Sequence, residues 1–412
     1  MSCPERRPRG RQAGFSLIEL MVALVIGSIM TLAIFGVMFT FEARKRTTTT
    51  TNDAIQAGSY AMYVVDKYIR SAGSGFTQAG PRPNESREDR LATAFGCRIL
   101  AAKGGSTLLP RGSALDAPFE NVNTTGTAGL FRLAPVIIAP QQSSGLGFGG
   151  ERSDVLIVMA GTGGFGEVPI PLTGAISANT MPVNSAVSLE AGDMLLLADQ
   201  LSAVDDVDSC MVQQVSTGAV TLPVGLGGSP YGATTISGFS HASYDDKSVA
   251  LKIGHPTRNP PNFLVVGVGA NNTLLSYDLL QTRTPALQAI ADNVFELHAV
   301  YGIDADGDGV TDAWYDPRSA ATAPNDFRLS TLMAGTGAAA DKIGQIKAIR
   351  VAMIVRSSLQ EKDADVSPAT FTLFGDVGLG RVRNLSTDER RFRYRVIEMT
   401  IPVRNAMLAP RQ

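Results

Sequence analysis

The feature that most constrains this chain is an uncharged apolar run at residues 20–41. As an α-helix the run is about 33 Å long, enough to cross the hydrocarbon core of a bilayer. Arginines before it favour a cytoplasmic N-terminus, whereas Arg44, Lys45 and Arg46 after it oppose that orientation. The sequence therefore predicts one membrane-spanning helix whose orientation charge alone leaves open. The preceding arginines are Arg6, Arg7, Arg9 and Arg11.

Glu19 separates three interpretations of this segment. A secretory signal peptide has a shorter apolar region followed by a small-residue cleavage site, and no clear site of that kind follows residue 41. A plain membrane anchor fits the length but gives no reason for an acid just inside the apolar run, where an ionised carboxylate is costly unless paired. The third interpretation, a helix that assembles with other subunits, supplies that reason.

Residues 14–19, Gly-Phe-Ser-Leu-Ile-Glu, resemble the class III leader junction of type IV prepilins and pseudopilins. The resemblance covers the basic leader, the Gly-Phe junction, the acid five residues after the glycine and the long apolar helix. It implies that a prepilin peptidase removes residues 1–14 by cutting after Gly14 and methylates the new amine of Phe15. It also implies that Glu19 pairs with an N-terminal amine during assembly, since a carboxylate and an ammonium attract strongly in a low dielectric.

The helix is predicted to continue beyond the apolar run. Apolar positions such as Ile55, Met62 and Val65 fall at helical spacing as far as about Arg70, and the Gly/Ser-rich residues that follow end the helix. Three segments result: a leader, a transmembrane and assembly helix, and a body large enough for a sizeable core and for two lobes. They are residues 1–14, 15–72 and 73–412.

The body is predicted to be β-rich and mostly antiparallel, because short apolar runs alternate with turn residues. The fold class is therefore α+β, a long N-terminal helix followed by a pilin-like β head. The clearest strands are at residues 155–159, 193–198, 263–267 and 349–356.

Two further strands carry more specific expectations. At residues 295–301 apolar side chains alternate with Glu296 and His298, which predicts a strand buried on one face only. Near the C-terminus the apolar phase changes between Val396 and Ile397, which predicts a β-bulge.

Several short segments of the body are similar to minor type IV pilins of the PilW type. This resemblance implies a low-abundance subunit that helps to start or cap a pilus together with other minor pilins. Residues 98–190 and 215–290 lie outside the resemblance. The similar segments are residues 95–97, 191–198, 292–294 with 301–304, and 391–405.

The chain has three cysteines, of which Cys3 lies in the leader. Cys97 and Cys210 remain as a pair, and in an oxidising periplasm they are expected to form a disulfide. Such a bridge closes a long loop and contributes up to about 4–5 kcal/mol on the chain-entropy model. Two buried free thiols are the alternative. Without a CxxC pair and with scattered histidines, the chain has no zinc-site spacing.

Residues 304–312 follow the pattern of a calcium-binding loop. Asp304, Asp306 and Asp308 occupy positions 1, 3 and 5, a glycine stands at position 6, and Asp312 at position 9. Ca²⁺ prefers several oxygen ligands, and three acids packed so tightly repel one another without a cation. The sequence therefore predicts a structural calcium site.

The loop departs from the pattern at position 12, where Tyr315 replaces glutamate. Asp312 or Asp316 would have to complete the shell, with the carbonyl of Val310 as a further ligand. A solvated acidic turn is the alternative interpretation, because Asp and Gly are ordinary turn residues.

Other kinds of chemistry find no support in the sequence. The formal net charge of −2 argues against a dedicated nucleic-acid binder. Residues 145–150 and 161–166 match GxGxxG, but the second is followed by a segment with two prolines that cannot open a regular helix, so both are interpreted as loops. No nucleophile can be tied to a histidine. We therefore expect no enzyme and no cofactor besides Ca²⁺.

The leading hypothesis is a structural minor pilin that takes part in initiating pilus assembly. Its expected partners are other minor pilins, the major pilin, the prepilin peptidase and a pilus-tip adhesin. It would span the inner membrane once, with a cytoplasmic N-terminus and a periplasmic head, before reaching the pilus and cell surface. The alternatives are a pseudopilin of a type II secretion system and a pilus-tip binding or adhesion module.

Overall fold

The computed structural model describes residues 14–76, 94–122, 129–163, 168–199, 209–218, 220–319, 325–363 and 365–407, apart from the side chains of Ala43, Arg44 and Asp199. The leader before Gly14, with its arginines and Cys3, lies outside the described residues. The chain divides into two units, Met1–Asn52 and Asp53–Gln412.

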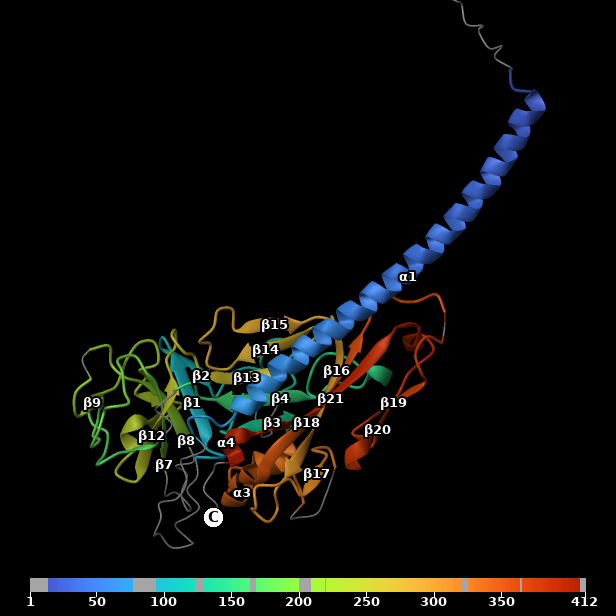
Figure 1. The fold of residues 1–412 in the computed structure, drawn as a ribbon. Helices are drawn as coiled ribbons and strands as arrows, with labels where there is room; N and C mark the ends of the chain where they lie inside the picture. The colour runs from blue at the N-terminus through green and yellow to red at the C-terminus, as the bar shows by residue number, and fades with distance from the viewer. Residues whose placement is uncertain are drawn as a thin grey trace, which may run out of the picture. The chain divides into compact units, whose positions relative to one another are not determined.

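One helix, α1 (Leu17–Ser71), begins in the first unit and ends in the second (Figure 1). By length and composition it contains a stretch able to cross a membrane. Its hydroxyl side chains bond along the helix: Thr31 donates to the Gly27 carbonyl at 2.7 Å, and Thr51 to the Thr47 carbonyl at 2.9 Å. These bonds satisfy the hydroxyl groups within the helix itself.

Residues 53–71 of α1 belong to the second unit and pack against the rest of it through an apolar face. A Cβ atom on Gly58 would lie only 2.4 Å from Cγ1 of Val355, so the absence of a side chain there allows a close approach. At the C-terminal end of α1, the amide of Asn405 donates to the carbonyls of Ser71 and Ala72, each at 3.1 Å. These carbonyls have no partner within the helix, and Asn405 caps them. The buried face comprises Ala54, Ala61, Met62, Val65 and Ile69.

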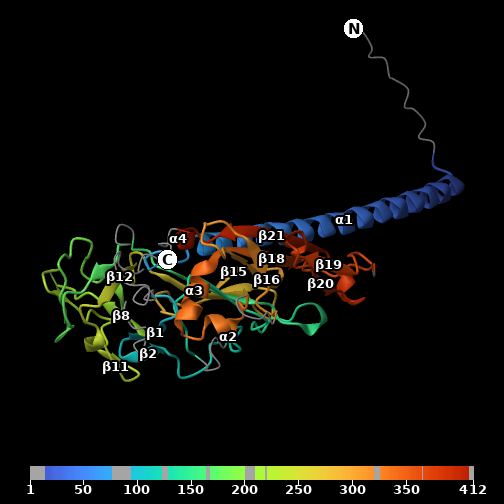
Figure 2. The same ribbon diagram turned by 90° about the horizontal axis from the view of Figure 1, so that it is seen from below.

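Three sheets form most of the second unit. In both ribbon views the six-stranded sheet lies at one end of this unit and the four-stranded sheet at the other (Figures 1 and 2). The six-stranded sheet has the order β2 (Ser106–Leu109), β1 (Arg98–Lys103), β8 (Ser209–Gln214), β7 (Met194–Asp199), β12 (Ser248–Gly254) and β5 (Ile170–Pro171). Its β1–β8 pair is parallel and its other pairs are antiparallel.

The other two large sheets are antiparallel throughout. The five-stranded sheet has the order β15 (Leu287–Ala291), β14 (Leu274–Asp278), β13 (Asn262–Val268), β4 (Val155–Ala160) and β3 (Val136–Ala139). The four-stranded sheet has the order β17 (Ala313–Tyr315), β16 (Val294–Ile303), β18 (Ile346–Arg356) and β21 (Tyr394–Pro402). The predicted strands at 155–159, 193–198, 263–267 and 349–356 are thus confirmed as β4, β7, β13 and β18, and so is the α+β class.

Smaller elements complete the unit. Two hairpins pair β19 (Thr370–Leu373) with β20 (Arg381–Asn384) and β10 (Thr235–Ile236) with β11 (Phe239–Ser240). A further two-stranded sheet pairs β6 (Thr180–Met181) with β9 (Val224–Gly225), which are distant in sequence. The short helices are α2 (Leu329–Leu332), α3 (Gly337–Gln345) and α4 (Arg404–Met407). Single 3₁₀ turns are η2 (Phe148–Gly150), η4 (His241–Ser243), η5 (Gly375–Val377) and η6 (Glu389–Arg391).

The four-stranded sheet is covered on both faces. One face contributes Leu297, Ala299 and Tyr301 to the largest core, which also contains the buried face of α1 from Ala61 onward. The other face packs with hairpin β19–β20 in a second core that includes Val300, Ile354 and the aromatic pair Phe148 and Phe295, whose ring centroids are 4.7 Å apart. This double cover buries β16 on both faces, whereas β21, at the edge of the sheet, is mostly half-buried or exposed.

Two expectations for these strands were wrong. All ten residues of β16 are buried, because the hairpin covers the face that was predicted to meet solvent. β21 pairs with β18 without a register shift, so it has no bulge. Val396 and Ile397 are both apolar because each contacts a core on its own side of the strand. A register shift occurs instead in β16, between Val294 and Glu296.

Candidate functional site

The predicted cleavage junction lies at the beginning of α1. Gly14, Phe15 and Ser16 precede the helix, and the Phe15 side chain is 83% exposed. The carbonyl of Ser16 accepts a hydrogen bond from the Leu20 amide at 3.1 Å. An exposed, non-helical segment is the kind of backbone that a peptidase can reach. Cleavage at Gly14 and methylation of Phe15 stay predictions.

Glu19 lies in the first turn of α1 and is exposed. Negative charge is favourable there, because the helix dipole is positive at its N-terminal end. Among the described residues, none donates a hydrogen bond to the Glu19 carboxylate or forms an ion pair with it. Large apolar side chains surround it on the helix, including Leu17, Leu20 and Val22, each more than half exposed. Glu19 is therefore an acid on an apolar rod without a described intramolecular partner.

Cys97 and Cys210 form a disulfide bond, with their Cα atoms 5.6 Å apart. Cys97 immediately precedes β1 and Cys210 lies in β8, so the bond joins two strands that pair in parallel. The two cysteines are 113 residues apart in sequence, so the bond closes a long loop. The alternative of two free thiols is therefore wrong.

The acidic loop converges on three of its predicted ligands. Oxygen atoms of Asp304, Asp306 and Asp312 lie within 4.8 Å of one another. The Asp304 carboxylate is buried and accepts hydrogen bonds from the amides of Gly307 at 2.6 Å and Gly309 at 2.8 Å. Asp312 accepts from the Ala305 amide at 2.7 Å. The backbone thus folds the loop around its carboxylates.

The remaining predicted ligands lie elsewhere. Asp308 accepts a hydrogen bond from the Val310 amide at 2.7 Å and does not belong to the converging group. The Val310 carbonyl stays a predicted ligand. Asp316 binds Arg381 at 2.9 Å and accepts from the Arg318 amide at 2.9 Å. Of the two acids expected to complete the calcium shell, Asp312 belongs to the converging group, whereas Asp316 is held by the Arg381 guanidinium and the Arg318 amide.

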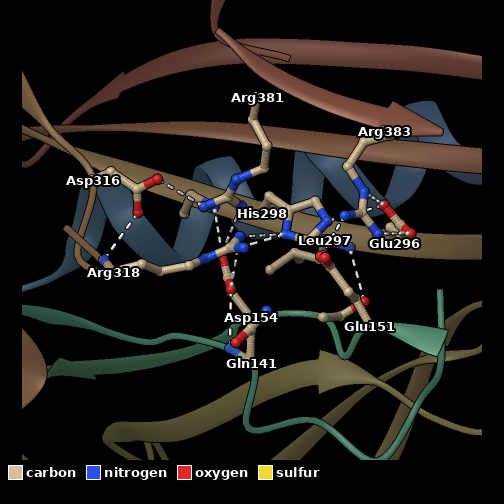
Figure 3. A network of polar contacts seen from close by, with 12 residues as sticks. Gln141, Glu151, Asp154, Glu296, Leu297, His298, Asp316, Arg318, Arg381 and Arg383 are labelled. Carbon is tan, nitrogen blue, oxygen red and sulfur yellow. Dashed lines mark hydrogen bonds and ion pairs between the residues drawn. The ribbon is translucent and has the colours of Figure 1, made fainter. Parts of the chain in front are cut away.

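The sequence did not reveal a cluster of buried charges on the outer face of β16 (Figure 3). Glu296 accepts bonds from Arg383 Nε at 2.9 Å and Nη2 at 2.7 Å, and from the Phe148 amide at 2.5 Å. Arg383 also pairs with Glu151 and donates to the Phe148 carbonyl at 3.1 Å. A Cβ on Gly147 would lie 2.0 Å from Glu296 Oε1, so the glycine-rich loop at 145–150 permits this approach. We call the whole set of contacts the β16 charge network.

His298 and Asp154 form the other half of the β16 charge network. His298 Nε2 donates to Glu296 at 3.0 Å, while Nδ1 lies 3.4 Å from Asp154 Oδ2 and 3.2 Å from Arg318 Nη2. Asp154 also accepts from the amides of Gln141 at 3.0 Å and Ala299 at 3.1 Å. Arg381 Nη1 lies 3.6 Å from Asp154. Every carboxylate here thus has partners from a distant part of the chain.

Charge balance and hydrogen bonding together determine the protonation of His298. The network holds four carboxylates and three guanidinium groups, so a protonated imidazole balances the charge. They are Glu151, Asp154, Glu296 and Asp316, and Arg318, Arg381 and Arg383. Burial acts to lower the pKa of His298, but its bonds to Asp154 and Glu296 outweigh burial and raise it. Burial acts to raise the pKa of Glu296. Its hydrogen bonds to His298 and Arg383, and their positive charges, together have the larger, opposite effect, so the pKa of Glu296 is lowered from its ordinary value.

The β16 charge network is suited to holding structure together. It ties hairpin β19–β20, the residues after β17 and the segment 151–154 to the centre of β16. Its polar groups bond to one another and to the backbone beneath the hairpin. The one local signal in the sequence was a Glu-x-His pair inside an otherwise apolar strand.

Two family comparisons match the chain, in different regions. Residues 263–405 match the family described as Type IV Pilus-assembly protein W. Residues 9–35 match the family described as Prokaryotic N-terminal methylation motif. The first region contains the acidic loop and part of the β16 charge network, and the second contains Gly14, Phe15 and Glu19. No curated protein and no solved structure matches the chain.

Proposed function

We propose that this chain, which its two family matches support as a minor pilin of the PilW type, takes part in initiating type IV pilus assembly. In this proposal the prepilin peptidase cuts between Gly14 and Phe15 and methylates Phe15. The mature helix then associates with the helices of other minor pilins and of the major pilin, and an adhesin at the pilus tip is a further partner.

The observation that carries the proposal is Glu19, an exposed acid at the start of an apolar helix with no described partner in its own chain. In a bilayer such a carboxylate is costly unless a positive group neutralises it. The terminal ammonium of a neighbouring subunit would supply that group, and the two charges would offset each other's desolvation. An initiating complex of several helices creates this pairing, whereas a solitary anchor does not.

The disulfide supports the proposed location of the head. Disulfides persist in oxidising compartments such as the periplasm and are rare in the cytoplasm. The Cys97–Cys210 bond therefore favours a single-pass topology with the N-terminus in the cytoplasm and Asp53–Gln412 in the periplasm. After assembly the head would be carried to the pilus and cell surface.

The match over residues 263–405 favours a pilus subunit over a pseudopilin of a secretion system, because the description of that family names pilus assembly.

A structural role is also proposed for the acidic loop. Its converging carboxylates offer only hard oxygen ligands, which suit Ca²⁺. Asp304, Asp306 and Asp312 would hold the ion, whose charge would relieve their mutual repulsion.

Mass spectrometry of the mature N-terminus tests the processing step. The full chain is purified from the membranes of a strain that makes the pilus and of a matched strain lacking the prepilin peptidase. We expect methylated Phe15 as the first residue in the former and an intact leader in the latter. An intact leader in both strains, or cleavage beyond residue 41, would refute the proposal.

A further inference from the structure

A cavity of about 420 Å³ opens at one end of the six-stranded sheet. Lys103 from the end of β1, Gln214 from the end of β8 and Gly192 just before β7 contribute to its wall, and so does the turn that begins at His255 after β12. Its volume is within the range of sites that hold small organic molecules. The cavity is distant in sequence from the acidic loop and shares no residue with the β16 charge network.

The cavity has a cation but no acid in its lining. Among the described residues, Lys103 forms no ion pair; its ammonium donates to the Gln281 carbonyl at 2.5 Å and lies 5.9 Å from the centre of the Tyr231 ring. The acids next to the lining are already paired: Glu190 with Arg258 at 2.6 Å, Asp193 with Lys252 at 2.8 Å, and Asp278, which accepts from Thr282, with Arg283 at 3.7 Å. The Lys103 ammonium is therefore the charge of this cavity without a counter-ion, and it favours an anionic ligand.

His255 presents a neutral N–H donor to the cavity. Its Nδ1 accepts hydrogen bonds from the backbone amides of Thr257 and Arg258, each at 3.2 Å. Because those amides can only donate, Nδ1 carries no proton and the hydrogen of the neutral ring is on Nε2. A Cβ on Gly192 would lie 2.9 Å from Nε2, so a residue with a side chain would cover this nitrogen. Burial, assisted by Arg258, lowers the pKa of His255 and keeps the ring neutral.

Two threonines in the lining carry hydroxyl oxygens. Thr282 donates its hydroxyl hydrogen to Asp278 at 2.6 Å, and the Thr257 oxygen lies 3.2 Å from His255 Nδ1, whose single lone pair is already shared by the two backbone amides. Their oxygen lone pairs remain free to accept hydrogen bonds from a ligand. The cavity thus combines a cation and an N–H donor with hydroxyl acceptors, which is the complement of a molecule that carries both an acid and hydroxyl groups.

We propose that this cavity binds a small acidic sugar, whose carboxylate contacts Lys103 and His255 Nε2 and whose hydroxyls donate to Thr257 and Thr282. The side chains of Pro230 and Pro256 line the same cavity and offer apolar surface to the C–H groups of a sugar ring. The inference concerns a ligand of the head and does not depend on leader processing or on Glu19.

Saturation-transfer NMR on the full chain tests the proposal, in a polyoxyethylene detergent that carries neither sugar nor charge. Three probes are compared: glucuronate, glucose as the matched neutral sugar, and inorganic phosphate as an anion without a sugar ring. We expect saturable binding of glucuronate, at least about tenfold weaker binding of glucose, and no displacement of glucuronate by equimolar phosphate. Equal binding of glucose, displacement by phosphate, or no binding of glucuronate would overturn the proposal.

Variants locate the site. Lys103→Met removes the charge and is expected to weaken glucuronate binding about tenfold or more. Ala191→Leu fills the cavity from another side without altering any ionisable group, and is expected to abolish binding. Lys247→Met, at an exposed lysine outside the cavity, should bind like the unchanged chain. If Lys103→Met lowers the melting temperature, its binding result is set aside and the test rests on Ala191→Leu. Unchanged glucuronate binding by Ala191→Leu contradicts the proposed site.

Discussion

Two acids of this chain lie on apolar segments and have opposite surroundings. Glu296 lies inside a buried strand, where Arg383, His298 and the Phe148 amide all donate to it. Glu19 lies on the apolar part of α1, where none of the described residues donates to it. An acid that is fully partnered within its own chain stabilises the fold. An acid without such partners, in a segment that can enter a membrane, would be stabilised by a positive group on another molecule, as the proposed function requires.

The largest expected effect tests the acid with the external partner. Glu19→Ala should reduce incorporation of the subunit into pili by about 100-fold or more, because the neighbouring ammonium would be left buried without its counter-charge. Immunoblotting of sheared pili against total membranes measures this effect. Glu42→Ala is the matched control, since Glu42 ends the apolar run of the same helix. Unchanged incorporation of Glu19→Ala would remove the contrast between the two acids.

The next effect tests the acid with internal partners. Glu296→Ala should lower the free energy of unfolding by about 3–5 kcal/mol, because Arg383 and His298 would stay buried without their carboxylate. Urea denaturation followed by fluorescence of Trp314, the single tryptophan, measures it. Glu190→Ala removes an exposed partner of Arg258 and should cost less than about 1 kcal/mol. Equal losses of unfolding free energy in the two variants would show that the β16 charge network stabilises the fold no more than an exposed ion pair does.

The acidic loop is an intermediate case, with acids that accept backbone bonds and yet repel one another. Calcium at 100 times its dissociation constant should stabilise the head by about 2.7 kcal/mol. The double variant Asp306→Asn, Asp312→Asn should lose this increment, as measured by thermal unfolding with calcium or with a chelator. Asp376→Asn, at an exposed acid outside the loop, should keep it. A melting temperature indifferent to calcium would contradict the metal proposal.

The smallest effect concerns the proton on His298. Its pKa is raised in the folded chain by its bonds to Asp154 and Glu296, against the opposing effect of burial. The stabilisation is therefore fully present below the ordinary pKa near 6.5 and is lost as the pH rises through the folded value, by no more than about 1.4 kcal/mol per pH unit. Unfolding measured from pH 5 to 9 should show this loss. In His298→Gln the loss should disappear, and a loss that persists there would assign it to another group.

Local patterns in the sequence were sufficient to predict α1 and several strands. The apolar run, the Gly/Ser-rich stop after Arg70 and the continuous runs of β4, β7 and β13 each reflect neighbours within a few residues. Spacing also placed the acids of residues 304–312 in one loop, because such a turn brings alternate side chains together. The disulfide followed from compartment and cysteine count, with no knowledge of the strand order.

What remained hidden depends on contacts between distant residues. Arg383 and Glu296 are 87 residues apart, and Glu151 is 232 residues from Arg383, so no periodicity connects them. The lack of a local pattern also explains why one face of β16 was wrongly predicted to be exposed. A strand with Glu296 and His298 on one face looks half-exposed until the hairpin β19–β20 is placed over that face. The ion pair of Asp316 was hidden for the same reason, since its partner Arg381 lies 65 residues away.

The cap on α1 has a consequence for the order of events in biogenesis. Asn405 reaches back 334 and 333 residues to the carbonyls of Ser71 and Ala72. A ribosome makes the helix early and Asn405 late, so the cap cannot form until nearly the whole head has been translated. A chain arrested before that point would keep the bond from the Ser74 amide to the Ser71 carbonyl, at 3.1 Å, but would lack both bonds from Asn405. The last hydrogen bonds at the end of α1 therefore wait for a residue that is synthesised more than 300 residues later.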